Sequence, residues 1–188
     1  MQKKHIITIA GKPGSGKSTT ANRVAEVLGF SRFSSGDFMR EIAQKRGVTI
    51  DELNQIAKTE VSIDGEIDSS LKALNKNDRL VIDSRLAFHW IPKSFKVYLE
   101  LDVEESARRI FTDTNERRIE SGERAATVGE IEDRIKERLE SEIERYKKLY
   151  DVNPNDSSQF DLIINTTDSS PNSVADKIIA AYHVWLEA

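Results

Sequence analysis

A glycine-rich segment near the N-terminus constrains the fold of this chain more than any other feature. It reads Gly11-Lys12-Pro13-Gly14-Ser15-Gly16-Lys17-Ser18-Thr19 and satisfies the pattern G-x-x-x-x-G-K-[ST] at every position. A strand-like run, Ile6–Ala10, precedes it, and a helical pattern, Lys17–Leu28, follows it. Glycines let the backbone turn its N–H groups inward, and the positive end of the following helix favours an anion. The segment therefore predicts a phosphate-binding loop (P-loop) for a nucleoside triphosphate.

The roles of the individual P-loop residues follow from this pattern. Lys17 is expected to reach the β- and γ-phosphates, and the Ser18 hydroxyl is expected to bind Mg²⁺. The alternative is an ordinary glycine-rich turn, which the flanking strand and helix disfavour. We predict that all nine residues, Gly11, Lys12, Pro13, Gly14, Ser15, Gly16, Lys17, Ser18 and Thr19, bind ATP.

The rest of the chain alternates between strand-like and helical patterns. This alternation predicts an α/β protein with the P-loop NTPase fold, in which a five-stranded, mainly parallel sheet is flanked by helices. The expected strands are Ile6–Ala10, Phe30–Phe33, Leu80–Asp83, Lys96–Leu101 and Leu162–Asn165. The expected helices are Lys17–Leu28, Asp37–Arg46, Ile50–Glu60, a stretch around Ile67–Leu74, Glu104–Phe111, Glu130–Tyr150 and about Pro171–Leu186.

Composition excludes several classes of function. The 188 residues include no cysteine, which excludes disulfides, thiolate catalysis and thiolate metal sites. The net charge is −4, so no overall positive field favours a nucleic acid. The apolar runs are far shorter than the roughly 20 residues that span a bilayer, and the first residues lack a signal-peptide pattern. We expect a cytoplasmic monomer whose partners include neither nucleic-acid polymers nor membranes.

Asp83 is the candidate partner for the metal ion. It ends the apolar run Leu80–Ile82, and parallel sheets place their ligands at the carboxyl ends of their strands. The alternative is that Asp83 caps a turn. Another segment, Asn75-Lys76-Asn77-Asp78, matches the guanine-reading pattern N-K-x-D, but it precedes this strand and no D-x-x-G segment occurs. We interpret it as a turn that ends a helix.

Several further segments resemble the nucleoside-monophosphate kinases and, more closely, the short archaeal-type cytidylate kinase family. They occur in the family order, cover nearly the whole chain, and only the first is common to all P-loop enzymes. The matching segments span residues 7–19, 34–40 (Ser-Ser-Gly-Asp-Phe-Met-Arg), 66–68 (Glu-Ile-Asp), 82–87 (Ile-Asp-Ser-Arg-Leu-Ala), 138–146 (Arg-Leu-Glu-Ser-Glu-Ile-Glu-Arg-Tyr) and 161–166 (Asp-Leu-Ile-Ile-Asn-Thr).

The resemblance implies an enzyme that transfers the γ-phosphate of ATP, with Mg²⁺, to a small phosphorylated acceptor, namely CMP or dCMP. It implies that Ser35, Asp37 and Arg40 contact the acceptor nucleotide and that Arg85 contacts its phosphate. Arg138 and Arg145 would close over the phosphates, so that Lys17, Arg85, Arg138 and Arg145 form the catalytic set. Arg109 is a further candidate, for stacking on adenine.

The spacing of Arg138 and Arg145 is compatible with this role, because residues seven apart lie on one helix face. The alternative is a solvated helix laced with Glu–Arg pairs, which the residues alone favour. We expect residues 1–188 to form a single P-loop kinase domain. Its acceptor-binding helical segment would span about 36–76 and its lid about 112–128, with Arg117, Arg118 and Arg124 as lid candidates.

Two departures from the family pattern bear on the acceptor. Ser69-Ser70-Leu71 stands where the family often has basic residues, and the segment from Thr112 to Val128 matches the family poorly. The alternatives are therefore another small-molecule P-loop kinase, acting on adenylate, uridylate or an acceptor such as shikimate, and a P-loop NTPase that acts as a switch.

Overall fold

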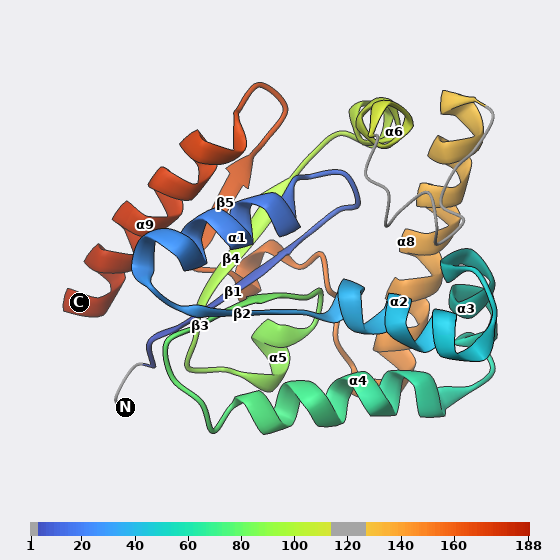
Figure 1. The fold of residues 1–188 in the computed structure, drawn as a ribbon, viewed down its shortest axis with the longest axis horizontal. Helices are drawn as coiled ribbons and strands as arrows, with labels where there is room; N and C mark the ends of the chain where they lie inside the picture. The colour runs from blue at the N-terminus through green and yellow to red at the C-terminus, as the bar shows by residue number, and fades with distance from the viewer. Residues whose placement is uncertain (1–3, 114–126) are drawn as a thin grey trace.

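A five-stranded parallel sheet forms the centre of the protein (Figure 1). The computed structural model describes residues 4–113 and 127–188. The strands, β1 (Ile6–Gly11), β2 (Ser31–Ser34), β3 (Leu80–Asp83), β4 (Phe95–Glu100) and β5 (Leu162–Asn165), are arranged in the order β2-β3-β1-β4-β5. Each neighbouring pair runs parallel. This arrangement confirms the predicted fold class.

Helices cover both faces of the sheet and extend beyond one end of it (Figure 1). The helix α1 (Lys17–Leu28) packs beside α9 (Pro171–Glu187), and the short α5 (Ala87–Trp90) lies against α4 (Val61–Leu74). The other helices lie beyond one end of the sheet, at the right of Figure 1. They are α2 (Ser35–Arg46), α3 (Ile50–Ile56), α6 (Val103–Thr112) and α8 (Val128–Tyr150), and a 3-10 turn, η1 (Ser157–Gln159), precedes β5.

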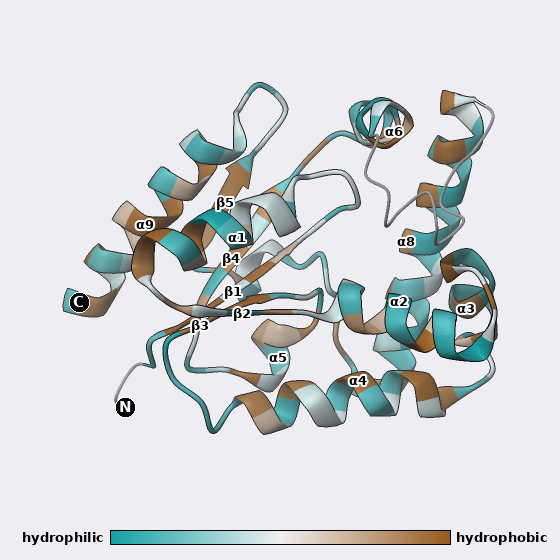
Figure 2. Cartoon of the chain, in the orientation of Figure 1, coloured by the Kyte–Doolittle hydropathy of each residue, from teal (hydrophilic) through white to brown (hydrophobic). Residues whose placement is uncertain are grey.

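Alternation along the strands divides the core into two layers. Ile7 and Ile9 of β1 pack with α1 and α9, whereas Ile6 packs with α4 and α5. The central strands β1, β3 and β4 are largely buried on both faces, as parallel strands covered on both sides require, and Figure 2 shows brown, hydrophobic segments among them. Burial of these apolar side chains, rather than any local propensity, holds the two helical layers on the sheet.

The strand register brings chemically active positions to one edge of the sheet. Ile9 of β1 lies opposite Asp83 of β3, and Ser34 of β2 lies opposite the same Asp83. Gly11 of β1 lies opposite Leu99 of β4. The residues that follow β1, β2 and β3 therefore emerge side by side, as the strand-end rule predicts.

Several predicted boundaries were wrong. The helix expected over Ile50–Glu60 ends at Ile56, because the chain turns there and lets Ile63 pack with Leu53 in one apolar cluster. The helix expected around Ile67–Leu74 begins earlier, at Val61, since the buried Ile63 and Asp64 anchor its first turn despite a glycine within it. The short α5 was not predicted, because only tertiary burial of Ala87 and Phe88 supports it.

Other boundaries differ by one or two residues. The second strand is Ser31–Ser34 rather than Phe30–Phe33, and α2 begins at Ser35 because Ser34 caps it. The Asn75–Asp78 segment lies between α4 and β3, with Asn75 at the end of the helix, as predicted for a helix-ending turn. Within residues 4–113 and 127–188, no helix combines the length and the apolar character that a bilayer crossing requires.

Gly11 is a position where the fold leaves no room for a side chain. Its φ is +144°, and a Cβ there would lie 2.3 Å from the carbonyl oxygen of Leu99. We expect Gly11→Ala to lower the free energy of unfolding by about 1–3 kcal/mol or more, because the backbone is strained and β4 must shift. Urea denaturation measures this loss.

The matched control is Gly65→Ala in α4, where a Cβ would meet nothing within 4 Å. That change should stabilise the protein by up to about 1 kcal/mol through helix propensity. Equal effects at the two glycines would contradict the close approach of β1 and β4.

Candidate active site

The segment Gly11–Thr19 runs from the end of β1 into the first turn of α1, in the strand–loop–helix order that the sequence predicts. The Lys12 carbonyl oxygen accepts hydrogen bonds from Ser15 Oγ at 2.8 Å and from Lys17 Nζ at 2.6 Å. These two bonds close the loop on itself. Its following helix begins at Lys17, so the positive end of α1 faces the loop.

Ser18 and Asp83 join the P-loop to the end of β3. Ser18 Oγ donates to Asp83 Oδ2 at 2.5 Å, and Asp83 is only 5% exposed. Mg²⁺ in nucleotide sites is held by one or two protein oxygens together with phosphates and waters. A hydroxyl and a carboxylate that meet at the P-loop fit that requirement. The described residues contain no cluster of three or more His, Cys, Asp or Glu that could hold a metal by itself.

Two adjoining hollows open beside this pair. The first has a volume of about 230 Å³ and brings Lys17, Ser18 and Arg109 together with Arg32 and Arg40. The second, of about 140 Å³, is lined by Lys17, Ser18, Asp83, Arg85 and Arg138. We call the second one the transfer hollow. Ser35 and Arg40 line it as well.

The start of α2 lies at the edge of both hollows. Ser34 caps the helix by accepting from the Asp37 backbone N–H at 3.2 Å. The Asp37 carboxylate lies between Arg32, at 3.2 Å, and Arg40, at 3.1 Å. Arg32 also approaches Asp83, at 3.4 Å. The predicted acceptor residues on α2 are thus tied to the Ser18–Asp83 pair through Arg32.

A buried carboxylate holds two of the predicted arginines. Glu142 of α8 pairs with Arg85 at 2.5 Å and with Arg138 at 2.9 Å. Burial alone would raise the pKa of Glu142, but Arg85 and Arg138 outweigh it and hold the pKa below its ordinary value. Burial in turn lowers the pKa of Arg85, against the attraction of Glu142. The two guanidinium groups are therefore fixed in place around one ionised carboxylate.

Arg145 occupies a different environment from Arg138. Its Nε lies 2.7 Å from Asp64 Oδ2 of α4, although the N–H is not aimed at that oxygen. Burial raises the pKa of Asp64, and Arg145 only partly offsets this effect. Arg145 does not line the transfer hollow; it lines the adjoining space between α4 and α8. The two arginines thus pair with different carboxylates, although both line the space between α4 and α8.

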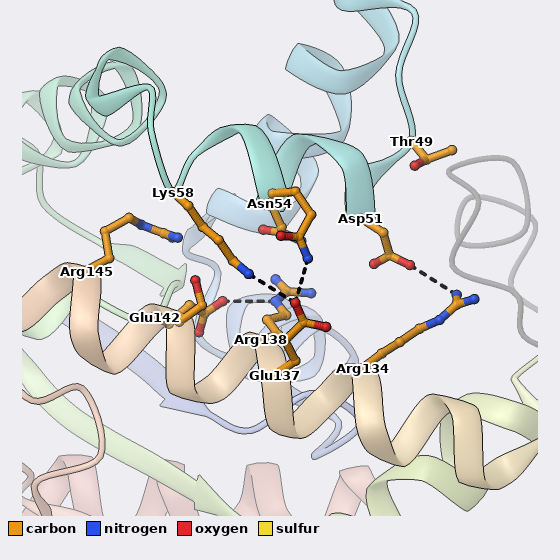
Figure 3. Close-up of a pocket in the computed structure, with 11 residues that line it drawn as sticks. Thr49, Asp51, Asn54, Lys58, Arg134, Glu137, Arg138, Glu142 and Arg145 are labelled. Carbon is orange, nitrogen blue, oxygen red and sulfur yellow. Dashed lines mark hydrogen bonds and ion pairs between the residues drawn. The ribbon is translucent and has the colours of Figure 1, made fainter.

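A third hollow, of about 390 Å³, lies between α3 and α8 (Figure 3). Arg134 pairs with Asp51 across it at 3.2 Å, and Glu137 pairs with Lys58 at 3.0 Å (Figure 3). Arg138, Glu142 and Arg145 line the same hollow. It is therefore continuous with the space around the arginines and belongs to the same site.

Arg109 lies at the other side of the P-loop, near the C-terminal end of α6. Its guanidinium donates to the carbonyl oxygens of Thr166 and Thr167, at 2.8 and 2.6 Å, and to Glu105 at 3.0 Å. The side chain therefore ties α6 to the segment that follows β5. Its predicted contact with adenine stays a prediction.

Two predictions concern the least family-like segments. The lid predicted at about 112–128, including Arg117, Arg118 and Arg124, lies almost entirely outside the described residues. Ser69 and Ser70, which replace basic residues of the family pattern, donate to the carbonyl oxygens of Gly65 and Glu66 within their own helix.

Sequence reasoning missed Arg32, Asp64 and Glu142. A signal existed for Arg32, because a charged residue in a strand-like segment needs a partner when the strand is buried. A weaker signal existed for Glu142, which stands one helical turn from both Arg138 and Arg145. Nothing local to α4 identifies Asp64, because its partner lies 81 residues away.

Comparison with known proteins bears on the family. A family model described as an AAA domain matches residues 10–135. The cytidylate kinase of Methanothrix thermoacetophila is 37% identical over 86% of this chain and 88% of that protein. The cytidylate kinase of Halobacterium salinarum is 33% identical over 96% of this chain and 90% of that protein.

Solved structures agree on the architecture. The shikimate kinase from Bacteroides thetaiotaomicron has a TM-score of 0.63 and 17% identity, over 97% of this chain and 98% of that one. At this identity the likeness shows the fold alone. The sequence matches go further and confirm the resemblance noted above. The chain belongs to the P-loop family described by the AAA-domain model and to the cytidylate kinase family.

Proposed function

We propose that this protein transfers the γ-phosphate of ATP to CMP or dCMP and yields the corresponding diphosphate and ADP. The observation that carries the proposal is the transfer hollow, which Lys17 and Ser18 of the P-loop line together with Arg85 and Arg138. Several cations around one hollow are what the approach of two anionic nucleotides requires. The cytidylate kinases to which this chain is similar support the choice of acceptor.

The donor side of the proposal is built on the P-loop. Residues Gly11–Thr19 would bind ATP, with Lys17 against the β- and γ-phosphates. Ser18 and Asp83 would hold Mg²⁺, whose charge offsets that of the leaving phosphate. A cytoplasmic setting remains a prediction.

The acceptor side of the proposal begins at the end of β2. Ser35, Asp37 and Arg40 would contact the nucleoside monophosphate, and Arg85 its phosphate. That phosphate is already ionised, so its oxygen attacks in line without a strong general base. Arg85 and Arg138 would neutralise the developing charge, and Glu142 holds both in advance. Closure over them by Arg145 remains a prediction, since Asp64 engages it outside the transfer hollow.

A panel of acceptors tests this proposal directly. ADP release is measured by a coupled assay with CMP, dCMP, UMP, AMP and shikimate as separate acceptors. The highest kcat/KM is expected with CMP or dCMP, and little ATP consumption without an acceptor. A higher kcat/KM with AMP or shikimate would overturn the acceptor, and hydrolysis that no acceptor stimulates would indicate an NTPase switch.

The first prediction about catalysis concerns Lys17. Lys17→Ala should reduce phosphoryl transfer to near the detection limit, because the developing charge on the phosphates loses its P-loop cation. The thermal unfolding temperature should change little, since the side chain lies at the P-loop rather than in the apolar core and bonds a carbonyl of that loop. Turnover close to that of the unmodified protein would contradict the assignment of the P-loop.

The second prediction separates a catalytic Arg138 from a surface ion pair. Arg138→Gln should lower kcat by about a hundredfold, the scale of one lost transition-state donor. Lys136→Gln is the matched control, because Lys136 lies on the same helix and pairs with Glu132 at its surface. The control should leave kcat unchanged and cost at most about 1 kcal/mol of stability. Equal, small effects at both positions would remove Arg138 from the mechanism.

The third prediction concerns the charge balance at Glu142. Glu142→Gln leaves Arg85 and Arg138 without their buried partner, so the free energy of unfolding at pH 7 should fall by about 3–5 kcal/mol. Glu132→Gln, which breaks only a surface pair, serves as the control.

The stabilisation from Glu142 depends on pH in a defined direction. The folded-state pKa of Glu142 lies below its ordinary value of 4.5, so its contribution is complete above that value. It is lost as the pH falls through the lower folded-state pKa. Urea denaturation at pH 7 and at steps below pH 4.5 should therefore show the variant and the unmodified protein converging. A constant difference across that range would contradict the pairing.

A further inference from the structure

Ser106 of α6 makes a contact with the P-loop that the mechanism above does not use. The residue is fully buried, and its Oγ donates to the Pro13 carbonyl oxygen at 2.6 Å. The two residues are 93 positions apart in the sequence. The buried hydroxyl and the carbonyl of the half-buried Pro13 thus satisfy each other, and removing the hydroxyl would take away the donor of this carbonyl.

Gly14 shows how closely the loop lies against the same residue. A Cβ at Gly14 would lie 2.9 Å from the Ser106 carbonyl oxygen and 3.0 Å from Ser106 Oγ. The φ of Gly14 is +70°, a left-handed conformation that glycine adopts without strain. Two consecutive P-loop residues, Pro13 and Gly14, thus both lie against Ser106.

The direction of the carbonyl groups explains why this contact matters. A phosphate cradle needs backbone N–H groups that face the anion, so carbonyl groups of the loop must turn away and find donors elsewhere. Lys12 finds its donors within the loop, from Ser15 and Lys17. The Pro13 carbonyl takes its donor from α6, through Ser106.

We propose that Ser106 is a positioning residue for ATP, which fixes the P-loop in its phosphate-binding conformation by holding the Pro13 carbonyl. The neighbouring Ala107 packs against Ile131 and Ile135 of α8 in one apolar cluster. The same turn of α6 therefore holds the P-loop on one side and, on the other, the helix that carries Arg138. The inference rests on the proposed function only in taking ATP as the nucleotide of the P-loop.

The test measures ATP affinity by equilibrium titration with Mg²⁺-ATP and the two KM values by the coupled assay. Ser106→Ala leaves the Pro13 carbonyl without its donor, so the dissociation constant and KM for ATP should rise on the order of tenfold. The KM for CMP should stay within about twofold of the unmodified protein. Ser106→Cys keeps the size of the side chain with a weaker donor, so its ATP affinity should fall between the two. This variant carries the test if the alanine variant does not fold.

Ser94→Ala is the matched control. Ser94 is also buried and donates to a backbone carbonyl, that of Ile91, at 2.8 Å, but it precedes β4 at the opposite edge of the sheet. Ser94→Ala should lower the thermal unfolding temperature about as much as Ser106→Ala does, and it should leave the ATP affinity unchanged. ATP affinity unchanged in both Ser106 variants, or KM values for ATP and CMP raised equally, would overturn the proposal. If the unmodified protein binds ATP normally but does not phosphorylate CMP, that result would contradict the proposed function and not the role of Ser106.

Discussion

All five strands run parallel, so each one delivers the residues that follow it to the same edge of the sheet. At that edge β1 leads into the P-loop, β2 into the cap of α2, and β3 into Asp83 and Arg85. Because β3 lies between β2 and β1, Asp83 stands between the acceptor-side helix and the P-loop. Its bonds to Ser18 and Arg32 follow from this order. The chemistry of the site therefore depends first on which strands are neighbours.

Charge balance is the second constraint on the site. The arginines around the transfer hollow are held by carboxylates: Arg85 and Arg138 by Glu142, and Arg40 by Asp37. Burying a cation without a partner would cost several kcal/mol of solvation free energy. The carboxylates offset this cost and hold the arginines at the hollow before any ligand binds. A group that is already oriented needs no reorganisation when charge develops on a phosphate. The acidic net charge of the chain is thus compatible with a locally cationic site.

The helices α6 and α8 connect the two sides of this site mechanically. Ser106 and Arg109 of α6 contact the P-loop and the segment after β5, respectively. Ala107 joins α6 to α8 through Ile131 and Ile135. Farther along, α8 reaches α3 through the pairs of Arg134 with Asp51 and of Glu137 with Lys58 (Figure 3). A displacement of α8 would therefore change the contacts of both the P-loop and the acceptor-side helices.

The sequence by itself determined the P-loop, its flanking strand and helix, the α/β class and Asp83 at a strand end, because these depend on local patterns of glycine, apolar residues and spacing. Tertiary structure alone decided the length of α4, the existence of α5, and the partners Asp64, Arg32 and Ser106. Arg138 and Arg145 show the difference most clearly. Helical periodicity places both on one face of α8. In the folded protein, however, Arg138 forms an ion pair with Glu142 at the transfer hollow, whereas Arg145 pairs with Asp64 of α4. A buried arginine needs a carboxylate partner, because burying an unpaired charge is costly. The tertiary fold decides which carboxylate lies close enough, and the local sequence pattern does not predict it.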